Sequence, residues 1–119
     1  MSHLMIKRGE IWQVDFCPSR GSEQKGIRPA LILQNNIGNQ YSSTTIVATI
    51  TTTIKKFPVT VVLECREGGL KEKSMVNTAQ LLTLDKSRLL RKMGSLSADR
   101  LTEVDLALKI SLGLIDSTR

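Results

Sequence analysis

Two strands and the loop between them occupy residues 10–33, which read EIWQVDFCPSRGSEQKGIRPALIL. The opening EIWQVDF alternates in polarity, with Trp12, Val14 and Phe16 on one face, which is typical of a strand. A polar loop flanked by glycines follows. PALILQN at residues 29–35 is then a nearly continuous apolar run, which is typical of a strand buried on both faces. This stretch predicts a chain that begins as a β-sheet.

Three more strands are expected, at residues 43–51, 59–64 and 74–82. They are rich in apolar and β-branched residues, and turn signals such as Pro58 and Gly68-Gly69 separate them. Short strands with recurring turns indicate a mainly β fold in the form of a small, strongly bent sheet or barrel.

The last third of the chain has a helical pattern. Asp85 can cap a short helical turn that runs to Leu90, and Ser97 can cap a helix from Ala98 to about Ile115. The apolar residues of this helix form two stripes instead of one. The first stripe is Leu101, Val104, Leu108, Leu112 and Ile115, and the second is Leu106, Ile110 and Leu114. The second stripe either packs inside the monomer or provides a contact between copies of the chain.

At 119 residues the chain has the length of one domain, and its hydrophobic fraction of 40% is ordinary for a globular protein. We expect residues 6–119 to form that domain, and residues 1–5 to be a disordered start extension or a leftover of cloning. No apolar run approaches the roughly 20 residues that span a bilayer. Cys17 and Cys65 do not make a disulfide framework. A cytoplasmic protein with free thiols is therefore expected.

The chain is basic, with 17 Lys and Arg residues against 11 acids and a formal net charge of +6. This charge suits a polyanion such as nucleic acid, or an acidic protein partner. Aromatic residues make up only 3%, so Trp12 is expected to be partly buried and not a platform for base stacking. The only histidine, His3, lies in the expected extension. The domain therefore lacks the side chain best suited to proton transfer, and neither a metal nor a cofactor is expected.

The loop GSEQKG has two glycines spaced as in a phosphate-binding loop of nucleotide-binding proteins. That motif continues with Lys-Ser or Lys-Thr and a helix, whereas Gly26 is followed by Ile27-Arg28-Pro29 and a strand. Nucleotide binding is therefore excluded. Pro29 restricts Arg28 to an extended backbone, and a guanidinium in this place offers forked donors to two phosphate oxygens.

Five segments, in order over residues 7–116, resemble the MazF/PemK family of toxin endoribonucleases. They read RGEIWQVDF, GSEQKGIRPALIL, VATIT, LDKSRL and EVDLALKISLGL. The resemblance implies a homodimer with an SH3-like barrel and a C-terminal helix, as in the MazF, PemK and CcdB toxins. It also implies sequence-specific cleavage of single-stranded mRNA without a metal, by attack of the 2′-OH, leaving 2′,3′-cyclic phosphate and 5′-OH ends. An acidic, MazE-like antitoxin of a type II toxin–antitoxin system would be the inhibiting partner.

The resemblance also assigns residues to roles. The family's catalytic arginine maps onto Arg28, and its catalytic threonine or serine maps onto Thr51, although Thr52 and Thr53 adjoin it and the assignment could shift by one. Glu23 is a second candidate base. The predicted RNA-binding residues are Gly21, Ser22, Glu23, Gln24, Lys25, Thr52, Lys55 and Gln80.

Two positions depart from the family pattern. Leu82 stands where the family often has an arginine, which removes a polar contact that bears on sequence specificity. Thr49 stands where other members carry a proline, a change expected to be neutral. Two alternatives remain open: a non-catalytic toxin of the same fold that binds a protein target such as gyrase, and a basic RNA-binding module without turnover. The pair of Arg28 and Thr51 favours the enzyme.

Overall fold

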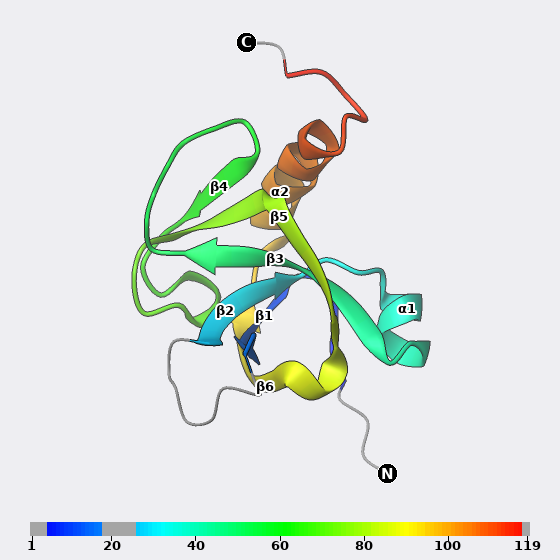
Figure 1. Cartoon of the computed structure of the whole chain (residues 1–119). Coiled ribbons are helices and arrows are strands. Elements are labelled where there is room, and N and C mark those ends of the chain that lie inside the picture. Colours follow the sequence, from blue (N-terminus) through cyan, green and yellow to red (C-terminus); the bar gives the residue numbers. More distant parts are fainter. Residues whose placement is uncertain (1–4, 18–25, 118–119) are drawn as a thin grey trace.

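A single curved antiparallel sheet dominates the computed structural model, which describes residues 5–17 and 26–117 (Figure 1). Within these ranges the strand order is β4-β5-β3-β2-β1-β6. The strands are β1 (Glu10–Asp15), β2 (Ile27–Ile32), β3 (Thr44–Thr51), β4 (Thr60–Leu63), β5 (Ser74–Asp85) and β6 (Leu89–Ser95). The helices are α1 (Asn36–Tyr41) and α2 (Ala98–Ser111), and two 3₁₀ turns are η3 (Glu67–Gly69) and η4 (Lys86–Arg88). The predicted mainly β fold with a C-terminal helix is confirmed.

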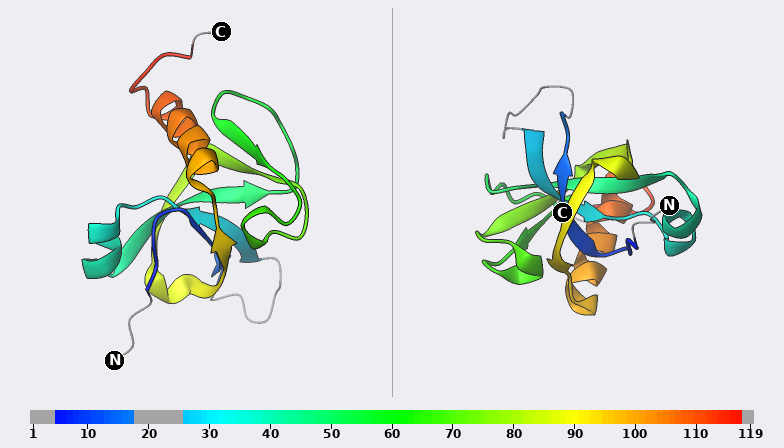
Figure 2. Two further views of the ribbon diagram at one scale, coloured as in Figure 1. Left: turned by 180° about the vertical axis from the view of Figure 1, so that it is seen from behind. Right: turned by 90° about the horizontal axis from the view of Figure 1, so that it is seen from below.

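The middle strands bury both of their faces, as the apolar run at 29–35 predicts. Along β2, Leu31 packs into one apolar cluster and its neighbours Ala30 and Ile32 into another. Helix α2 covers the first cluster through Val104 and Ala107, and it lies against β4 and β5 in every view (Figure 2). The second cluster consists of Ile6, Trp12, Val14, Ala30, Ile32, Val47, Leu84 and Leu89. Each apolar face of the sheet therefore has its own core.

The two ends of the sheet approach each other through η3, which follows β4 in the chain and packs on β6. The backbones touch directly: a Cβ atom on Gly69 would lie 2.0 Å from the Met93 carbonyl oxygen, and one on Gly94 would lie 2.5 Å from the Gly68 carbonyl carbon. Only glycine permits such an approach. The contact gives the sheet the closed curvature of a small barrel.

Helix α1 was not predicted, because its segment reads as a polar loop around Gly38. It is held by side chains more than by burial of an apolar stripe. Asn35 accepts a hydrogen bond from the Gly38 N–H at 2.8 Å as an N-cap. The buried Asn39 accepts from the Thr45 hydroxyl at 2.8 Å and donates to the Gln34 carbonyl oxygen at 2.9 Å. These bonds attach α1 to the ends of β2 and β3.

The helical turn predicted from Asp85 to Leu90 is wrong in its second half. Asp85 caps the short η4 turn by accepting from the Ser87 N–H at 2.9 Å. Leu89 and Leu90 instead begin β6, an edge strand that pairs with β1. Only Leu89 of the two is buried, so no apolar alternation marks the strand.

The predicted cap of α2 is confirmed, because the Ser97 hydroxyl accepts from the Arg100 N–H at 3.1 Å. The helix ends at Ser111 and not near Ile115. Gly113 takes a left-handed φ of 75°, its N–H donates to the Ile110 carbonyl oxygen, and the Leu114 N–H donates to the Lys109 carbonyl oxygen. This is a Schellman ending, which glycine favours.

The start of the chain is described from residue 5 onward, and residues 1–4 lie outside the described residues. Of the expected start extension, only Met5 lies within the described residues, and its side chain is 77% exposed, whereas Ile6 is buried. None of the helices in the ranges 5–17 and 26–117 has the length and apolar character needed to cross a membrane.

Candidate active site

Arg28 and Thr51, the two predicted catalytic residues, line one shallow pocket of about 450 Å³. The strands that carry them are neighbours, and Ala30 of β2 pairs with Thr49 of β3. Continuing this antiparallel register by two residues places Arg28 opposite Thr51. Residues two apart on a strand share a face, so both side chains lie on the face of Ala30 and Thr49. The complete lining is Ile27, Arg28, Pro29, Ile50, Thr51, Thr52, Thr53 and Ser74.

The Arg28 side chain is exposed at the edge of the second apolar cluster, beside its β1 partner Val14. Among residues 5–17 and 26–117 no carboxylate forms an ion pair with it. Its guanidinium is a fixed positive charge with forked donors. A phosphate in the pocket would meet this charge.

Thr51 ends β3, and its hydroxyl oxygen accepts a hydrogen bond from the Thr53 N–H at 3.1 Å. This bond occupies a lone pair and leaves the O–H proton available for a second acceptor. Thr52 and Thr53 line the same pocket and are exposed. Of the three, only Thr51 lies within β3, and continuing the register of Ala30 and Thr49 places it opposite Arg28.

The predicted RNA-binding residues fall into three groups. Gly21, Ser22, Glu23, Gln24 and Lys25 lie outside the described residues, so the structure describes neither that loop nor the candidate base Glu23. The two ends of the loop are joined, since the Phe16 N–H donates to the Gly26 carbonyl oxygen at 2.7 Å. Thr52 lines the pocket. Lys55 and Gln80 are exposed beyond it, and Gln80 accepts a hydrogen bond from the Thr49 hydroxyl at 3.0 Å.

Two residues near the pocket were not predicted. Ser74, at the start of β5, lines the pocket, is 2% exposed and donates to the Glu72 carbonyl oxygen at 2.9 Å. No motif marks it, because it reaches the pocket only through the pairing of β5 with its neighbours. Thr49 could have been found from Thr51, since residues two apart on a strand share a face.

Trp12 is not one of the residues that line the pocket, and it is 7% exposed, so it is buried more fully than expected. Its indole N–H donates to Glu10 at 2.9 Å. Glu10, itself buried, also pairs with Lys92 at 3.1 Å. The tryptophan therefore belongs to the core and is not a surface on which bases stack.

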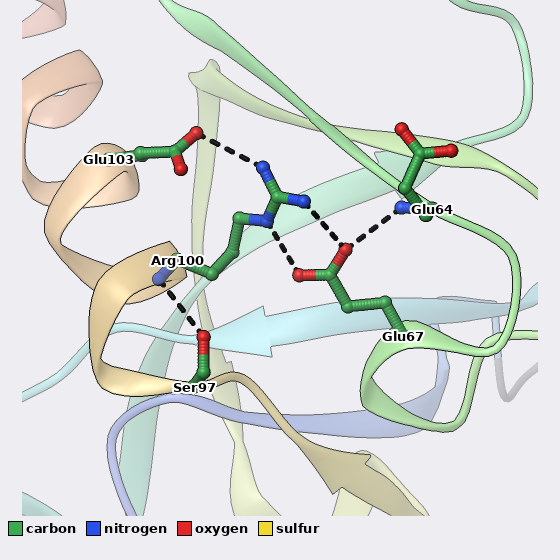
Figure 3. Close-up of polar contacts among 5 residues, drawn as sticks. All are labelled: Glu64, Glu67, Ser97, Arg100 and Glu103. Atoms are coloured by element: carbon green, nitrogen blue, oxygen red, sulfur yellow. Dashed lines mark hydrogen bonds and ion pairs between the residues drawn. The ribbon is translucent and has the colours of Figure 1, made fainter.

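The strongest ion-pair network in the described part of the chain is remote from the pocket and joins η3 to α2 (Figure 3). Arg100 donates to both oxygens of Glu67, at 2.6 and 2.9 Å, and to Glu103 at 3.1 Å. Desolvation raises the pKa of Glu67, but the hydrogen bonds from Arg100 and the Glu64 N–H outweigh it, so the pKa is lowered overall. The Glu67 hydrogen bond raises the pKa of Arg100 in turn. These residues fix the helix on the sheet.

A larger groove of about 860 Å³ runs between α2, β4 and the connection from β3 to β4. Exposed apolar side chains surround it, among them Phe57 (59% exposed) and Leu106 (53% exposed). Leu106 and Ile110 of the second helical stripe line this groove and do not enter the core. Burial of the second stripe inside the monomer is therefore contradicted for Leu106 and also for Leu114, which is 69% exposed.

The fold is a curved β-sheet with a C-terminal helix, and its pocket combines the Arg28 guanidinium with threonine hydroxyls at the ends of two neighbouring strands. These features define a small basic β protein with a pocket suited to a phosphate. The sequence model of one family matches residues 7–112, and it is described as the PemK-like, MazF-like toxin of type II toxin–antitoxin systems. The chain belongs to this family.

Solved structures agree with this family. An endoribonuclease from a mycobacterial species, solved with its cognate antitoxin, is 25% identical, with a TM-score of 0.80 over 94% of this chain and 99% of that chain. MazF from Deinococcus radiodurans is 29% identical, with a TM-score of 0.74 over 92% and 98% of the two chains. A mycobacterial endoribonuclease 23% identical, with a TM-score of 0.81 over 98% and 100%, supports the fold alone.

Proposed function

We propose that this toxin is a sequence-specific endoribonuclease that cleaves single-stranded mRNA without a metal. The observation that carries the proposal is the pocket that Arg28 and Thr51 both line, on the neighbouring strands β2 and β3. The family membership and the endoribonuclease among its solved relatives at 25% identity support it.

The reaction is a transfer within the RNA. The 2′-oxygen forms a bond to phosphorus while the bond from phosphorus to the 5′-oxygen breaks. The 2′-OH loses its proton, and the 5′-oxygen gains one, so the products are a 2′,3′-cyclic phosphate and a 5′-OH end. Negative charge accumulates on the non-bridging phosphate oxygens during this exchange. Preorganised donors aimed at such oxygens are usually the largest contribution to catalysis.

Arg28 supplies two of these donors and a full positive charge, and Thr51 supplies a third donor. The Thr51 hydroxyl is oriented for this role because the Thr53 N–H already occupies one of its lone pairs. Thr52, Lys55 and Gln80 contact the RNA on either side, together with the residues of the 21–25 loop. The net charge of +6 attracts the RNA to this surface.

The toxin acts as a homodimer in the cytoplasm and is inhibited by an acidic antitoxin. The apolar groove along α2 provides the dimer contact, since Phe57 and Leu106, which line it, are both more than half exposed in the monomer. A relative solved with its cognate antitoxin supports the existence of such a partner. An acidic segment of this partner would compete with RNA for the basic surface.

The direct test is incubation of the purified protein with a long single-stranded transcript in EDTA. Discrete fragments that a kinase can label at their 5′-OH ends are expected. Intact RNA that remains bound to the protein would overturn the proposal in favour of a binding module. Intact, unbound RNA would favour a toxin that acts on a protein target.

A further inference from the structure

Thr49 and Gln80 form a hydrogen-bonded pair that continues the row of Arg28 and Thr51. The Thr49 hydroxyl donates to the Gln80 side-chain oxygen at 3.0 Å. Thr49 lies two residues before Thr51 on the same face of β3, so the two Cα atoms are roughly 7 Å apart. This is about the spacing of consecutive nucleotides in an extended strand. The pair is therefore placed where a base next to a phosphate held by Arg28 and Thr51 would lie.

Gln80 reaches this face by the register that precedes a bulge in β5. Ala48 pairs with Leu81, and continuing that register by one residue places Gln80 beside Thr49. The bulge begins there, since Thr49 pairs with Asn77 and residues 78–80 have no partner on β3. Bulges of this kind re-aim side chains and are frequent beside functional sites.

Hydrogen bonds at the start of the bulge hold its shape. The Asn77 side chain accepts from the Ala79 N–H at 2.9 Å. The buried Thr78 hydroxyl lies 2.7 Å from the Val59 carbonyl oxygen and 3.2 Å from that of Ala107. Thr78 is thus anchored between β4 and α2, while Gln80 is exposed toward Thr49. The strand register therefore places Gln80 beside Thr49, and specific hydrogen bonds hold the bulge next to it.

In the structure the Gln80 amide oxygen faces the Thr49 hydroxyl. With the hydroxyl as donor to that oxygen, the NH₂ group is presented outward with two donors. A donor at this place matches a keto oxygen, such as uracil O4 or guanine O6. It repels the amino groups of cytosine and adenine, which carry donors at the corresponding positions.

We propose that Thr49 is a positioning residue that orients the Gln80 amide, and that this amide selects a keto base (U or G) next to the scissile phosphate. The inference rests on the proposed ribonuclease function and adds a specificity element to it. It also gives a role to Thr49, a position where the change from the family's proline was expected to have no effect.

The test maps the 5′-OH ends produced from a randomised RNA pool in EDTA. The wild-type protein should prefer U or G over C or A at one position beside the cut. Thr49→Val keeps the shape and removes the hydroxyl, so it should reduce that preference about 2- to 10-fold, the range expected for one hydrogen bond. Thr49→Ser should retain it, and Thr102→Val, an exposed threonine on α2, is the matched control.

A double-mutant comparison separates positioning from mere strand stability. Gln80→Leu should lose the preference, and adding Thr49→Val to it should change nothing further, because both act through one contact. Additive effects, or a Thr49→Val profile identical to that of the wild type, would overturn the role of Thr49. If the wild-type protein itself cuts no RNA, the proposed function fails as well, and this outcome is distinguishable from the other two.

Discussion

Thr51 holds its place through contacts that are local and easily altered. It ends β3, its hydroxyl accepts from the Thr53 N–H at 3.1 Å, and the side chain is half-buried. A change at this position can therefore remove the donor without removing core packing. The same is true of Arg28, which is exposed.

Replacing Thr51 by valine should slow RNA cleavage about 100-fold or more, as expected for loss of one oriented donor. Thr51→Ser should retain most of the activity because it keeps the hydroxyl. The rate is measured with a short fluorescent RNA under single-turnover conditions, and the thermal melt of each variant is recorded beside it. Equal rates for Thr51→Val and the wild type would move the role to Thr52 or Thr53, which line the same pocket.

The sequence alone could not predict that Arg28 and Thr51 lie in one pocket. Arg28 and Thr51 were identified by resemblance to a family, and their meeting in one pocket follows from the register of β2 and β3. The register is a property of two strands together. The position of Gln80 beside Thr49 likewise follows from the register of β3 and β5, and no local pattern of residues 74–82 predicts the bulge next to it.

Individual elements are joined by a few specific contacts, of which the ion pairs of Arg100 and the contact of η3 with β6 are the clearest. Both connect the turn after β4 to the C-terminal third of the chain. Arg100 and Glu67 are each less than one quarter exposed, so their pair is only partly screened by water. These contacts determine how firmly the curved sheet is closed.

The lowered pKa of Glu67 predicts a pH-dependent part of the stability. Because the folded-state pKa lies below the ordinary value of 4.5, the stabilisation is present above pH 4.5 and is lost as the pH falls further. Glu67→Gln should lower the free energy of unfolding by about 1 kcal/mol at pH 7, and by less at pH 3. Urea unfolding at both pH values measures this, with the exposed Glu72→Gln as control. A deficit that is equal at both pH values would contradict it.

The direct backbone contact of η3 with β6 predicts an intolerant glycine. Gly94→Ala should destabilise the protein by about 2 to 3 kcal/mol, because its Cβ would lie 2.5 Å from the Gly68 backbone. Gly113→Ala is the control: it has a left-handed φ of 75° but no atom within 4 Å of its Cβ, so it should cost about 1 kcal/mol. Thermal melts of both variants measure the loss of stability. Equal losses for Gly94→Ala and Gly113→Ala would contradict the backbone contact between η3 and β6.

At the element scale the sequence predicted what alternation or helical periodicity can encode. Strands β1 to β5 and helix α2 follow from such patterns. Strand β6 does not, because as an edge strand it buries Leu89 and exposes Leu90, Arg91 and Lys92. Helix α1 does not either, because the hydrogen bonds of the buried Asn39 to Gln34 and Thr45 hold it. Such contacts exist only once the sheet has formed.

The whole molecule presents two surfaces of different character. The pocket of Arg28 and Thr51 holds a positive charge and hydroxyl groups, whereas the groove along α2 is apolar and larger, about 860 Å³ against about 450 Å³. Contiguous exposed apolar surface of this kind commonly marks a protein contact. We propose that RNA binds at the first surface and a second copy of the chain at the second.

Leu106→Glu should convert the proposed dimer into a monomer, because it places a charge in the apolar contact. Size-exclusion chromatography with light scattering measures the mass over a range of concentrations. Leu90→Glu, at an exposed leucine on β6, is the control that should remain dimeric. A wild-type protein that is monomeric at every concentration would contradict the assignment of the groove.

The proposed function requires Arg28 to stabilise the scissile phosphate of RNA without a metal. The decisive experiment compares the single-turnover cleavage rates of the wild type and of Arg28→Ala on one single-stranded RNA in EDTA. We expect wild-type products with 5′-OH ends and a rate about 100- to 1000-fold lower for the variant, with an unchanged thermal melt. Equal rates for the two folded proteins, or no wild-type cleavage at all, would contradict it.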